Sequence, residues 1–473
     1  MKPFERMIGE AWDSSIVPTL CRYIEIPNKS PMFDADWHKH GYMRDAINLL
    51  ADWCKRSGVV GLEPQIVELP GRTPVLFGEL AGSSPDAPTV LLYGHYDKQP
   101  EFTGWQDGLG PWTPVIRDGR LYGRGGADDG YATFASLTAI AALQRDGLPL
   151  PRCVLLIEGC EESGSFDLPF YLEHLGPRIG TPNLVVCLDA ECGDYERLWL
   201  SSSLRGLLIG TLEVSVLTEG VHSGAASGIV PSSFRILRSL LDRIEDATSG
   251  RVIDALHVPI EAQTRADARD LVEVLGDVIV DRYPWQSGVT PMAQDAVELV
   301  LNNTWRPTLS VTGLSGAPPV TSAGNTLRPS TSAKLSIRLP PTLDGNVAER
   351  VVKSLLETNP PYGAHVRFIS DGGQQGWAAP KIDPALAASF AQASQLYFDK
   401  PVRYMGMGGT IPFLKMLGDR FPKAQFMVTG VLGPHSNAHG PNEFLDIETG
   451  KRITCCVAHV LANYAGESQA ARS

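Results

Sequence analysis

The chain has 473 residues, which is long for a single hydrophobic core and favours two domains. Hydrophobic residues make up 43% and charged residues 20%, a composition typical of a folded globular protein and not of a disordered or fibrous one. The 53 acidic residues outnumber the 41 basic ones, and the resulting formal charge of -12 argues against a nucleic-acid or anionic-membrane partner.

Nothing in the sequence reads as a membrane or export signal. No stretch approaches the roughly 18 consecutive apolar residues of a membrane helix, and residues 1–6 are not followed by the apolar segment of a signal peptide. Eight cysteines in so long a chain do not make a disulfide framework, and Cys153 and Cys187 lie in apolar runs typical of buried positions. We therefore expect a cytoplasmic protein.

Three short apolar runs in the first part of the chain predict strands at 89–93, 154–157 and 184–188. They are apolar on both faces, as strands covered by helices on each side are. A helix rich in Ala and Leu is expected at 133–144, and Gly147 stops it. This order of elements predicts an α/β fold with a mostly parallel sheet.

The character of the sequence changes near residue 206. The elements predicted beyond it are a partly alternating strand at 207–216, a helix at 232–245, a strand at 334–339, a helix at 347–356, a strand at 365–369, a helix at 385–398 and a strand at 425–428. We expect an α+β domain inserted at 206–377, between two pieces of one catalytic domain at 1–205 and 378–473.

Acidic or imidazole residues follow each of the three early strands, at the edge where open α/β sheets bind ligands. The candidates along the chain are His95, Asp97, Asp128, Asp129, Glu161, Glu162, Asp189, His435 and His439. Each of them alone has an ordinary explanation, such as a turn, a helix cap or a solvated pair. Their joint occurrence at successive strand ends favours a metal site, and this mixture of ligands suits zinc or manganese.

Four separated motifs resemble the metal-site motifs of the M20 metallopeptidase family, in the order in which that family has them. They are Gly-His-Tyr-Asp at 94–97, Gly-Arg-Gly-Gly-Ala-Asp-Asp-Gly at 123–130, Glu-Glu-Ser-Gly-Ser at 161–165 and His-Gly-Pro-Asn-Glu at 439–443. The chain is most similar to the carnosinase-type dipeptidase branch, and the similarity extends through 120–125, 305–307 and 335–339. The resemblance implies a phosphorylase/hydrolase-like catalytic domain with an inserted lid and dimerisation domain.

The resemblance also implies the roles of the candidate residues at two divalent metal ions, zinc before manganese. His95 and Asp189 would bind one ion, Glu162 and His439 the other, and Asp128 would bridge the two. Asp97 would accept the second ring N–H of His95 and so fix its tautomer. Glu161 would be the general base, free of the metals, and the peptide bond between Asp128 and Asp129 would be cis.

The same resemblance implies that several residues of the inserted domain bind the substrate or the oxyanion. His222, a loop histidine, would stabilise the oxyanion in the active site of the other subunit, which implies a homodimer joined through this domain. Arg338 would hold the carboxylate of the substrate as a bidentate donor. Asn325 would contact the substrate or the oxyanion, and backbone amides at Gly409 and Thr410 could cradle a carboxylate.

The chain departs from the dipeptidase pattern at two places. Gly130 and Tyr131 stand where this branch usually has Lys-Gly, and Met407 stands where it tends to have an acid near the amino group of the substrate. The missing charge favours an N-blocked substrate, whereas Asp189 favours the dipeptidases, because the deacylase and carboxypeptidase branches generally carry Glu there.

Three interpretations of the function therefore compete. The first is a dipeptidase acting on small peptides with a free carboxylate, and the second is an N-acyl-amino-acid amidohydrolase or a carboxypeptidase with the same ligands. The third is a binding protein that retained the fold without activity. The complete set of ligands together with Glu161 argues against the third.

Overall fold

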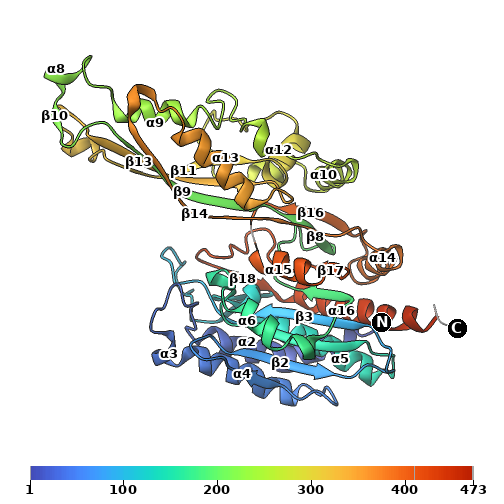
Figure 1. Ribbon diagram of the computed structural model, residues 1–473. Helices are drawn as coiled ribbons and strands as arrows, with labels where there is room; N and C mark the ends of the chain where they lie inside the picture. Colours follow the sequence, from blue (N-terminus) through green and yellow to red (C-terminus); the bar gives the residue numbers. More distant parts are fainter. Residues whose placement is uncertain (1, 410, 471–473) are drawn as a thin grey trace. The chain divides into compact units, whose positions relative to one another are not determined.

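Two compact units make up the computed structural model, which describes residues 2–409 and 411–470 (Figure 1). Unit 1 consists of Met1–Ser202, Ala379–Met405 and Met416–Ser473, and unit 2 consists of Ser203–Ala378 and Gly406–Lys415. Unit 1 is thus assembled from both ends of the chain and unit 2 mainly from its middle.

A six-stranded sheet forms the centre of unit 1, in the order β1-β2-β6-β3-β7-β17. Its strands are β1 (Gln65–Val67), β2 (Val75–Leu80), β3 (Thr89–His95), β6 (Arg152–Glu158), β7 (Leu184–Cys187) and β17 (Gln425–Val428). The pairs β6–β3, β3–β7 and β7–β17 are parallel, whereas β2 runs antiparallel to both of its neighbours. Only β2 therefore opposes the common direction, and the predicted α/β fold with a mostly parallel sheet is confirmed.

Helices cover this sheet, and one of them lies deep in the core. The helix α5 (Ala132–Arg145) is buried at every residue from Ala132 to Leu143, because it packs between β3 and the last helix, α16 (Ile447–Ala470). Helices buried on all sides are apolar all round, which is the pattern of this segment. The other helices of this part of the chain are α1 (Glu5–Ala11), α2 (Val17–Ile24), α3 (Trp37–His40), α4 (Tyr42–Arg56), α6 (Leu168–His174), α7 (Gly176–Ile179), α14 (Pro384–Phe398) and α15 (Pro412–Arg420).

Two smaller sheets lie outside the central one. The first contains β4 (Val115–Arg117), β5 (Arg120–Tyr122) and β18 (Phe444–Asp446), and the second contains β8 (Trp199–Leu204), β15 (Trp377–Ala378) and β16 (Arg403–Met407). In the first, Phe444 of β18 pairs with Tyr122 of β5, which joins segments more than 300 residues apart.

Unit 2 is built on a four-stranded antiparallel sheet in the order β11-β13-β9-β14. The strands are β11 (Thr308–Ser315), β13 (Ser330–Leu339), β9 (Gly206–Ser215) and β14 (His365–Gln374). Buried residues alternate strictly with partly exposed ones along β9 and β13, so one face of the sheet is in the core and the other is not. The observed β9 and β14 correspond to the strands predicted at 207–216 and 365–369.

Two amphipathic helices, α9 (Ser233–Leu241) and α13 (Gly345–Glu357), cover the buried face of that sheet (Figure 1). Ser232 caps α9 and Asp344 caps α13, each with a side-chain oxygen that accepts backbone N–H groups of the first turn. The helix predicted at 232–245 ends earlier, at Leu241. The remaining elements are β10 (Val221–His222), α8 (Ser223–Ala226), α10 (Ala262–Leu275), α11 (Val278–Asp281), α12 (Ala296–Thr304) and β12 (Thr326–Leu327).

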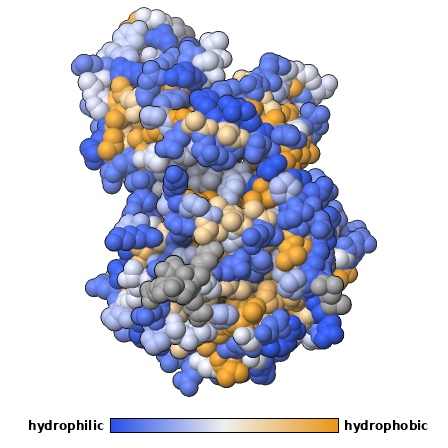
Figure 2. Space-filling view, turned by 90° about the vertical axis from the view of Figure 1, so that its right-hand side faces the viewer, coloured by the Kyte–Doolittle hydropathy of each residue, from blue (hydrophilic) through white to orange (hydrophobic). Residues whose placement is uncertain are grey.

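The surface agrees with the acidic, polar composition. Hydrophilic residues predominate on the face shown in Figure 2, and apolar residues are interspersed among them. Among the described residues, no helix combines the length and the apolar character that a membrane crossing requires.

Candidate metal centre

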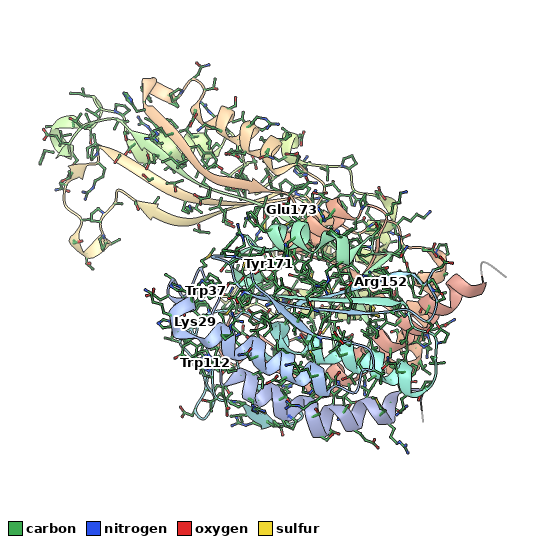
Figure 3. All side chains as sticks on the ribbon, turned by 60° about the horizontal axis from the view of Figure 1, so that its bottom comes forward. Lys29, Trp37, Trp112, Arg152, Tyr171 and Glu173 are labelled. Carbon is green, nitrogen blue, oxygen red and sulfur yellow. The ribbon has the colours of Figure 1, made fainter. Side chains whose placement is uncertain are left out.

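The candidate residues of unit 1 gather at the carboxyl end of the parallel strands. His95 is the last residue of β3, Asp189 follows β7 by two positions, and Glu161 and Glu162 form a single turn three residues beyond β6. Asp128 lies in the turn Gly126–Gly130 that leads into α5. Figure 3 shows Arg152, which begins β6, at the opposite end of the strands from Lys29 and Trp37.

A first group of ligand atoms consists of His95, Asp128 and Asp189, whose donor atoms all lie within 4.8 Å of one another. The Nε2 atom of His95 is 3.3 Å from Asp128 Oδ1 and 3.7 Å from Asp189 Oδ2. All three side chains are buried, with at most 8% exposed, so this group is shielded from solvent.

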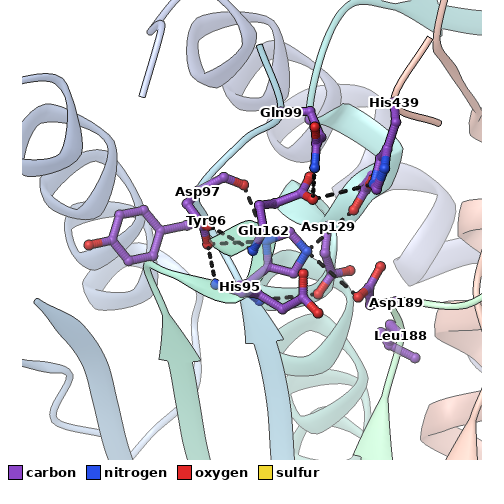
Figure 4. A network of polar contacts seen from close by, with 12 residues as sticks. His95, Tyr96, Asp97, Gln99, Asp129, Glu162, Leu188, Asp189 and His439 are labelled. Carbon is purple, nitrogen blue, oxygen red and sulfur yellow. Dashed lines mark hydrogen bonds and ion pairs between the residues drawn. The ribbon is translucent and has the colours of Figure 1, made fainter. Parts of the chain in front are cut away.

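A second group consists of Asp128, Glu162 and His439 and is shown in part in Figure 4. The Nε2 atom of His439 is 3.0 Å from Asp128 Oδ2 and 3.3 Å from Glu162 Oε2. The two groups thus share Asp128, which turns one carboxylate oxygen toward each. The side chain of His439 is 55% exposed, so this group lies at the solvent side of the centre.

The polar atoms of the centre fit divalent cations. His95 Nε2 and Glu162 Oε1 are buried and make no hydrogen bond, which leaves a lone pair on each for a cation. Burial and the charge of Asp128 raise the pKa of Glu162 to about 8 and that of Asp189 to about 7. Carboxylates crowded in this way bind protons when no metal neutralises them, and metal ions normally displace such protons.

Asp97 contacts two of the ligand-bearing segments without belonging to either ligand group. The Nδ1 atom of His95 is hydrogen-bonded to the backbone O of Asp97 at 3.2 Å and lies 3.4 Å from Asp97 Oδ1, which leaves Nε2 to face Asp128 and Asp189. The two carboxylate oxygens of Asp97 also accept hydrogen bonds from the backbone N–H groups of Glu161 (3.1 Å) and Glu162 (3.0 Å). Asp97 thus orients the imidazole through its backbone oxygen and its nearby carboxylate, and the glutamate turn through its carboxylate.

Gln99 is a residue of the centre that the sequence analysis missed. Its Nε2 atom donates a 2.6 Å hydrogen bond to Glu162 Oε2, the oxygen that also faces His439 (Figure 4). The spacing in the sequence could have revealed Gln99, because His95, Asp97 and Gln99 occupy alternate positions. In extended chain such residues point to one side.

Glu161 belongs to neither ligand group, although it adjoins Glu162. Burial raises the pKa of Glu161 well above its ordinary value, and the negative charges of Asp189 and Glu162 act in the same direction. The peptide bond between Asp128 and Asp129 is cis, as the resemblance implied. The centre thus combines two groups that could each hold a cation with one buried carboxylate of raised pKa outside them.

Comparison with known proteins gives the family. The model of "Peptidase family M20/M25/M40" matches residues 91–463, which is most of the chain. The chain belongs to this peptidase family.

Relatives match the chain over most of its length. The chain is 28% identical over 390 residues to the cysteinylglycine-S-conjugate dipeptidase of Corynebacterium striatum, covering 80% of this chain and 82% of that protein. It is also 28% identical over 397 residues to the human Beta-Ala-His dipeptidase, covering 80% and 76%. The solved structure of the di-peptidase Dug1p from Saccharomyces cerevisiae has the same fold, with a TM-score of 0.76, 22% identity and 98% of each chain covered.

The described substrate and oxyanion candidates of this M20 chain lie in unit 2. His222 on β10 pairs with Thr326 on β12, and the Ser223 N–H donates to Asn325 O at 2.9 Å, so His222 and Asn325 are neighbours. Arg338 lies near the far end of β13, where it pairs with Leu207 of β9 and Thr308 of β11.

Gly409, the candidate for binding a carboxylate through its backbone, also belongs to unit 2. A side chain at Gly409 would meet nothing within 4 Å, whereas Gly408 lies against Asn303. The Arg205 guanidinium donates a hydrogen bond to Gly408 O and so anchors the residue before Gly409. Thr410 lies outside the described residues.

Proposed function

We propose that this M20 peptidase hydrolyses the peptide bond of dipeptides or dipeptide-like substrates that carry a free carboxylate. The observation that carries this proposal is the sharing of Asp128 between two ligand groups, with Glu161 outside both. The dipeptidase names of the Corynebacterium striatum and human relatives supply the substrate class.

In this proposal His95 and Asp189 would hold one divalent ion, Glu162 and His439 would hold the second, and Asp128 would contribute to both. Imidazole and carboxylate ligands suit zinc first and manganese second. Divalent ions held there would supply Lewis acidity for the scissile carbonyl and would lower the pKa of the attacking water.

Glu161 is the general base of the proposed reaction. Its carboxylate accepts a proton from the attacking water and returns that proton to the leaving nitrogen. Asp97 fixes the backbone of Glu161 through the 3.1 Å hydrogen bond described above, so the base keeps its position while its carboxylate changes charge. Asp97 also holds His95 in the tautomer that leaves Nε2 for the metal.

We assign the substrate carboxylate to Arg338 and to backbone amides at Gly409 and Thr410, and the oxyanion to His222 and Asn325. The geometry of unit 2 supports a division between two copies of the chain. Between Ser330 and Arg338 the strand β13 runs for about 26 Å at 3.3 Å per residue, and His222 and Asn325 precede its Ser330 end. A dipeptide spans only about 7 Å.

This separation supports a site that draws its substrate-binding residues from two copies of the chain. We propose a homodimer joined through unit 2, in which His222 and Asn325 serve the active site of the partner copy. We also place the protein in the cytoplasm, which the eight free cysteines support.

The second candidate is an N-acyl-amino-acid amidohydrolase of the same family. Met407 favours it, because this side chain is apolar and 6% exposed where the dipeptidase pattern has an acid for the free amine. Both candidates share all metal ligands, so substrates must separate them.

The deciding experiment measures metal content and turnover together. Protein stripped of metal and reloaded with Zn²⁺ or Mn²⁺ is assayed on matched pairs of free dipeptides and N-acyl amino acids that share the C-terminal residue. We expect two ions per chain and faster turnover of the free dipeptides. Faster turnover of the acylated partners would establish the second candidate, and failure to bind any divalent ion would refute both.

A further inference from the structure

The two segments that carry Asp128 and His439 come from distant parts of the chain and are tied together by a buried ion pair. Arg124 Nη1 contacts Glu443 Oε2 directly, and the side chains are 1% and 0% exposed. Glu443 lies four residues after His439, and Arg124 lies four residues before Asp128. The pair therefore stands between two metal-ligand segments without belonging to either ligand group.

Three further hydrogen bonds surround this ion pair, and we call the ion pair together with these bonds the clamp. Arg124 Nη2 donates to Gly440 O (2.8 Å), and the Gly125 N–H donates to Glu443 Oε1 (2.8 Å). The Gly123 N–H donates to Glu443 O at 3.0 Å. These bonds prolong the pairing of β5 with β18 beyond the last strand residues and into the two ligand segments.

The His439 loop needs such an anchor. His439 has a φ of +63°, and Asn437 and Asn442 have φ values of +54° and +63°, all in the left-handed region that disfavours non-glycine residues. The half-exposed His439 side chain is also the ligand least confined by packing. The loop is therefore held by specific contacts and not by its own conformational preference.

The other ligand group does not depend on that loop. His95 and Asp189 lie at the ends of β3 and β7, which are adjacent parallel strands of the central sheet. Loosening the clamp should therefore affect the group of Asp128, Glu162 and His439 and spare the group of His95, Asp128 and Asp189.

We propose that the Arg124–Glu443 ion pair is a positioning device that keeps His439 in place, so that the chain retains a second divalent ion. This inference rests on the proposed dinuclear function. It adds that retention of the second ion, and not of the first, depends on Arg124 and Glu443, which contact neither substrate nor metal.

Zinc binding at equilibrium tests the clamp. Metal-free protein is dialysed against buffered free Zn²⁺ over a range of concentrations, and bound zinc is measured per chain. For Glu443→Gln we expect one ion held as in the parent protein and a second ion bound at least about tenfold more weakly, as is usual when partners behind the ligands are lost. The matched control is Asp167→Asn, which disrupts the largely buried Arg72–Asp167 pair (2.7 Å) of the same unit; we expect it to bind two ions normally.

A second variant separates positioning from mere stabilisation. Replacing a buried ion pair by apolar residues often preserves stability, so Arg124→Met combined with Glu443→Leu should recover the melting temperature while keeping only one tightly bound ion. Two tightly bound ions in this double variant, or in a folded Glu443→Gln protein, would overturn the proposal. Equal weakening of both ions would overturn it as well. A parent protein that binds no ion would refute the proposed function itself.

Discussion

Glu161 and Glu162 are neighbours in the chain, yet the structure gives them different surroundings. Glu162 Oε2 faces His439 and accepts from Gln99, whereas Glu161 joins no ligand group. The backbone N–H groups of both residues donate to Asp97, so one carboxylate fixes the turn that separates their roles.

Substitution of Glu161 by Gln removes the proposed base and preserves the size of the side chain. We expect turnover to fall by about 10²–10⁴-fold, the usual contribution of a general base, while two ions per chain remain bound. Glu162→Gln is the control, because it should lose the second ion. Turnover of Glu161→Gln near the parent rate would exclude Glu161 from proton transfer.

At the scale of elements, Tyr131 links the turn that carries Asp128 to the strand that leads to Asp189. Its ring is buried at the start of α5, and its hydroxyl donates a 2.6 Å hydrogen bond to Leu188 O. Gly130 before it could not carry a side chain, since a Cβ would lie 2.4 Å from Tyr23 and 2.5 Å from Gly125 O. The Gly-Tyr departure from the dipeptidase pattern is therefore a packing feature of the centre.

Removal of the Tyr131 hydroxyl tests this link. Tyr131→Phe should cost about 1 kcal/mol of unfolding free energy, the typical value of one hydrogen bond, and should weaken the ion at His95 and Asp189 by about tenfold. Tyr171→Phe is the control, because Tyr171 is equally buried, donates to Thr73 O at 2.7 Å and accepts from the Leu69 N–H at 3.0 Å. The control should lose at least as much stability without a change in zinc affinity; weakened zinc binding in both variants would disprove the link.

Helices and strands could be predicted from the sequence where a local run of apolar residues determines them. The apolar runs that predicted β3, β6 and β7 are buried strands, and the Ala- and Leu-rich run is α5. The helices α1 to α4 and the antiparallel β2 were not predicted. Strand direction depends on which neighbour offers backbone partners, and β2 pairs with β6, more than 70 residues away in sequence.

At the scale of the whole molecule, the proposed dimer makes activity a property of two chains. A Glu161→Gln chain and a His222→Ala chain should each be inactive alone. After subunit exchange, about half of the dimers are mixed, and each mixed dimer has one intact site, so about a quarter of the parent activity should return. Exchange verified by tagged chains without any recovery would place His222 in its own chain's site or outside catalysis.

Metal and pH act on the whole molecule through the buried centre. In metal-free protein the folded-state pKa values of Glu162 and Asp189, about 8 and about 7, lie above their unfolded values. Burial tends to lower the pKa of His439, but the hydrogen bond with Asp128 and the charge of Glu162 raise it to about 10. The stability that these bound protons provide is fully present below the unfolded pKa of each group and is lost as pH rises through the folded one.

We therefore expect the melting temperature of metal-free protein to fall between about pH 5 and pH 9. Zinc requires the deprotonated ligands, so its apparent affinity and the stabilisation it provides should rise over the same interval. Calorimetry with chelator and with zinc at several pH values measures both trends. A melting temperature of metal-free protein that rises with pH would contradict the assignment of these protons.

By itself, the sequence determined the chemistry of the centre. The residue types, together with acidic and imidazole residues after successive strands, predicted a metal site, and the resemblance to the family motifs selected His95, Asp128, Glu162, Asp189 and His439 as its ligands. The family resemblance already implied which ligands stand together, and only the tertiary structure decided that Gln99 bonds Glu162 and that Arg124 meets Glu443. Those contacts join parts of the chain more than 60 and more than 300 residues apart, and no local pattern encodes a distance across the fold.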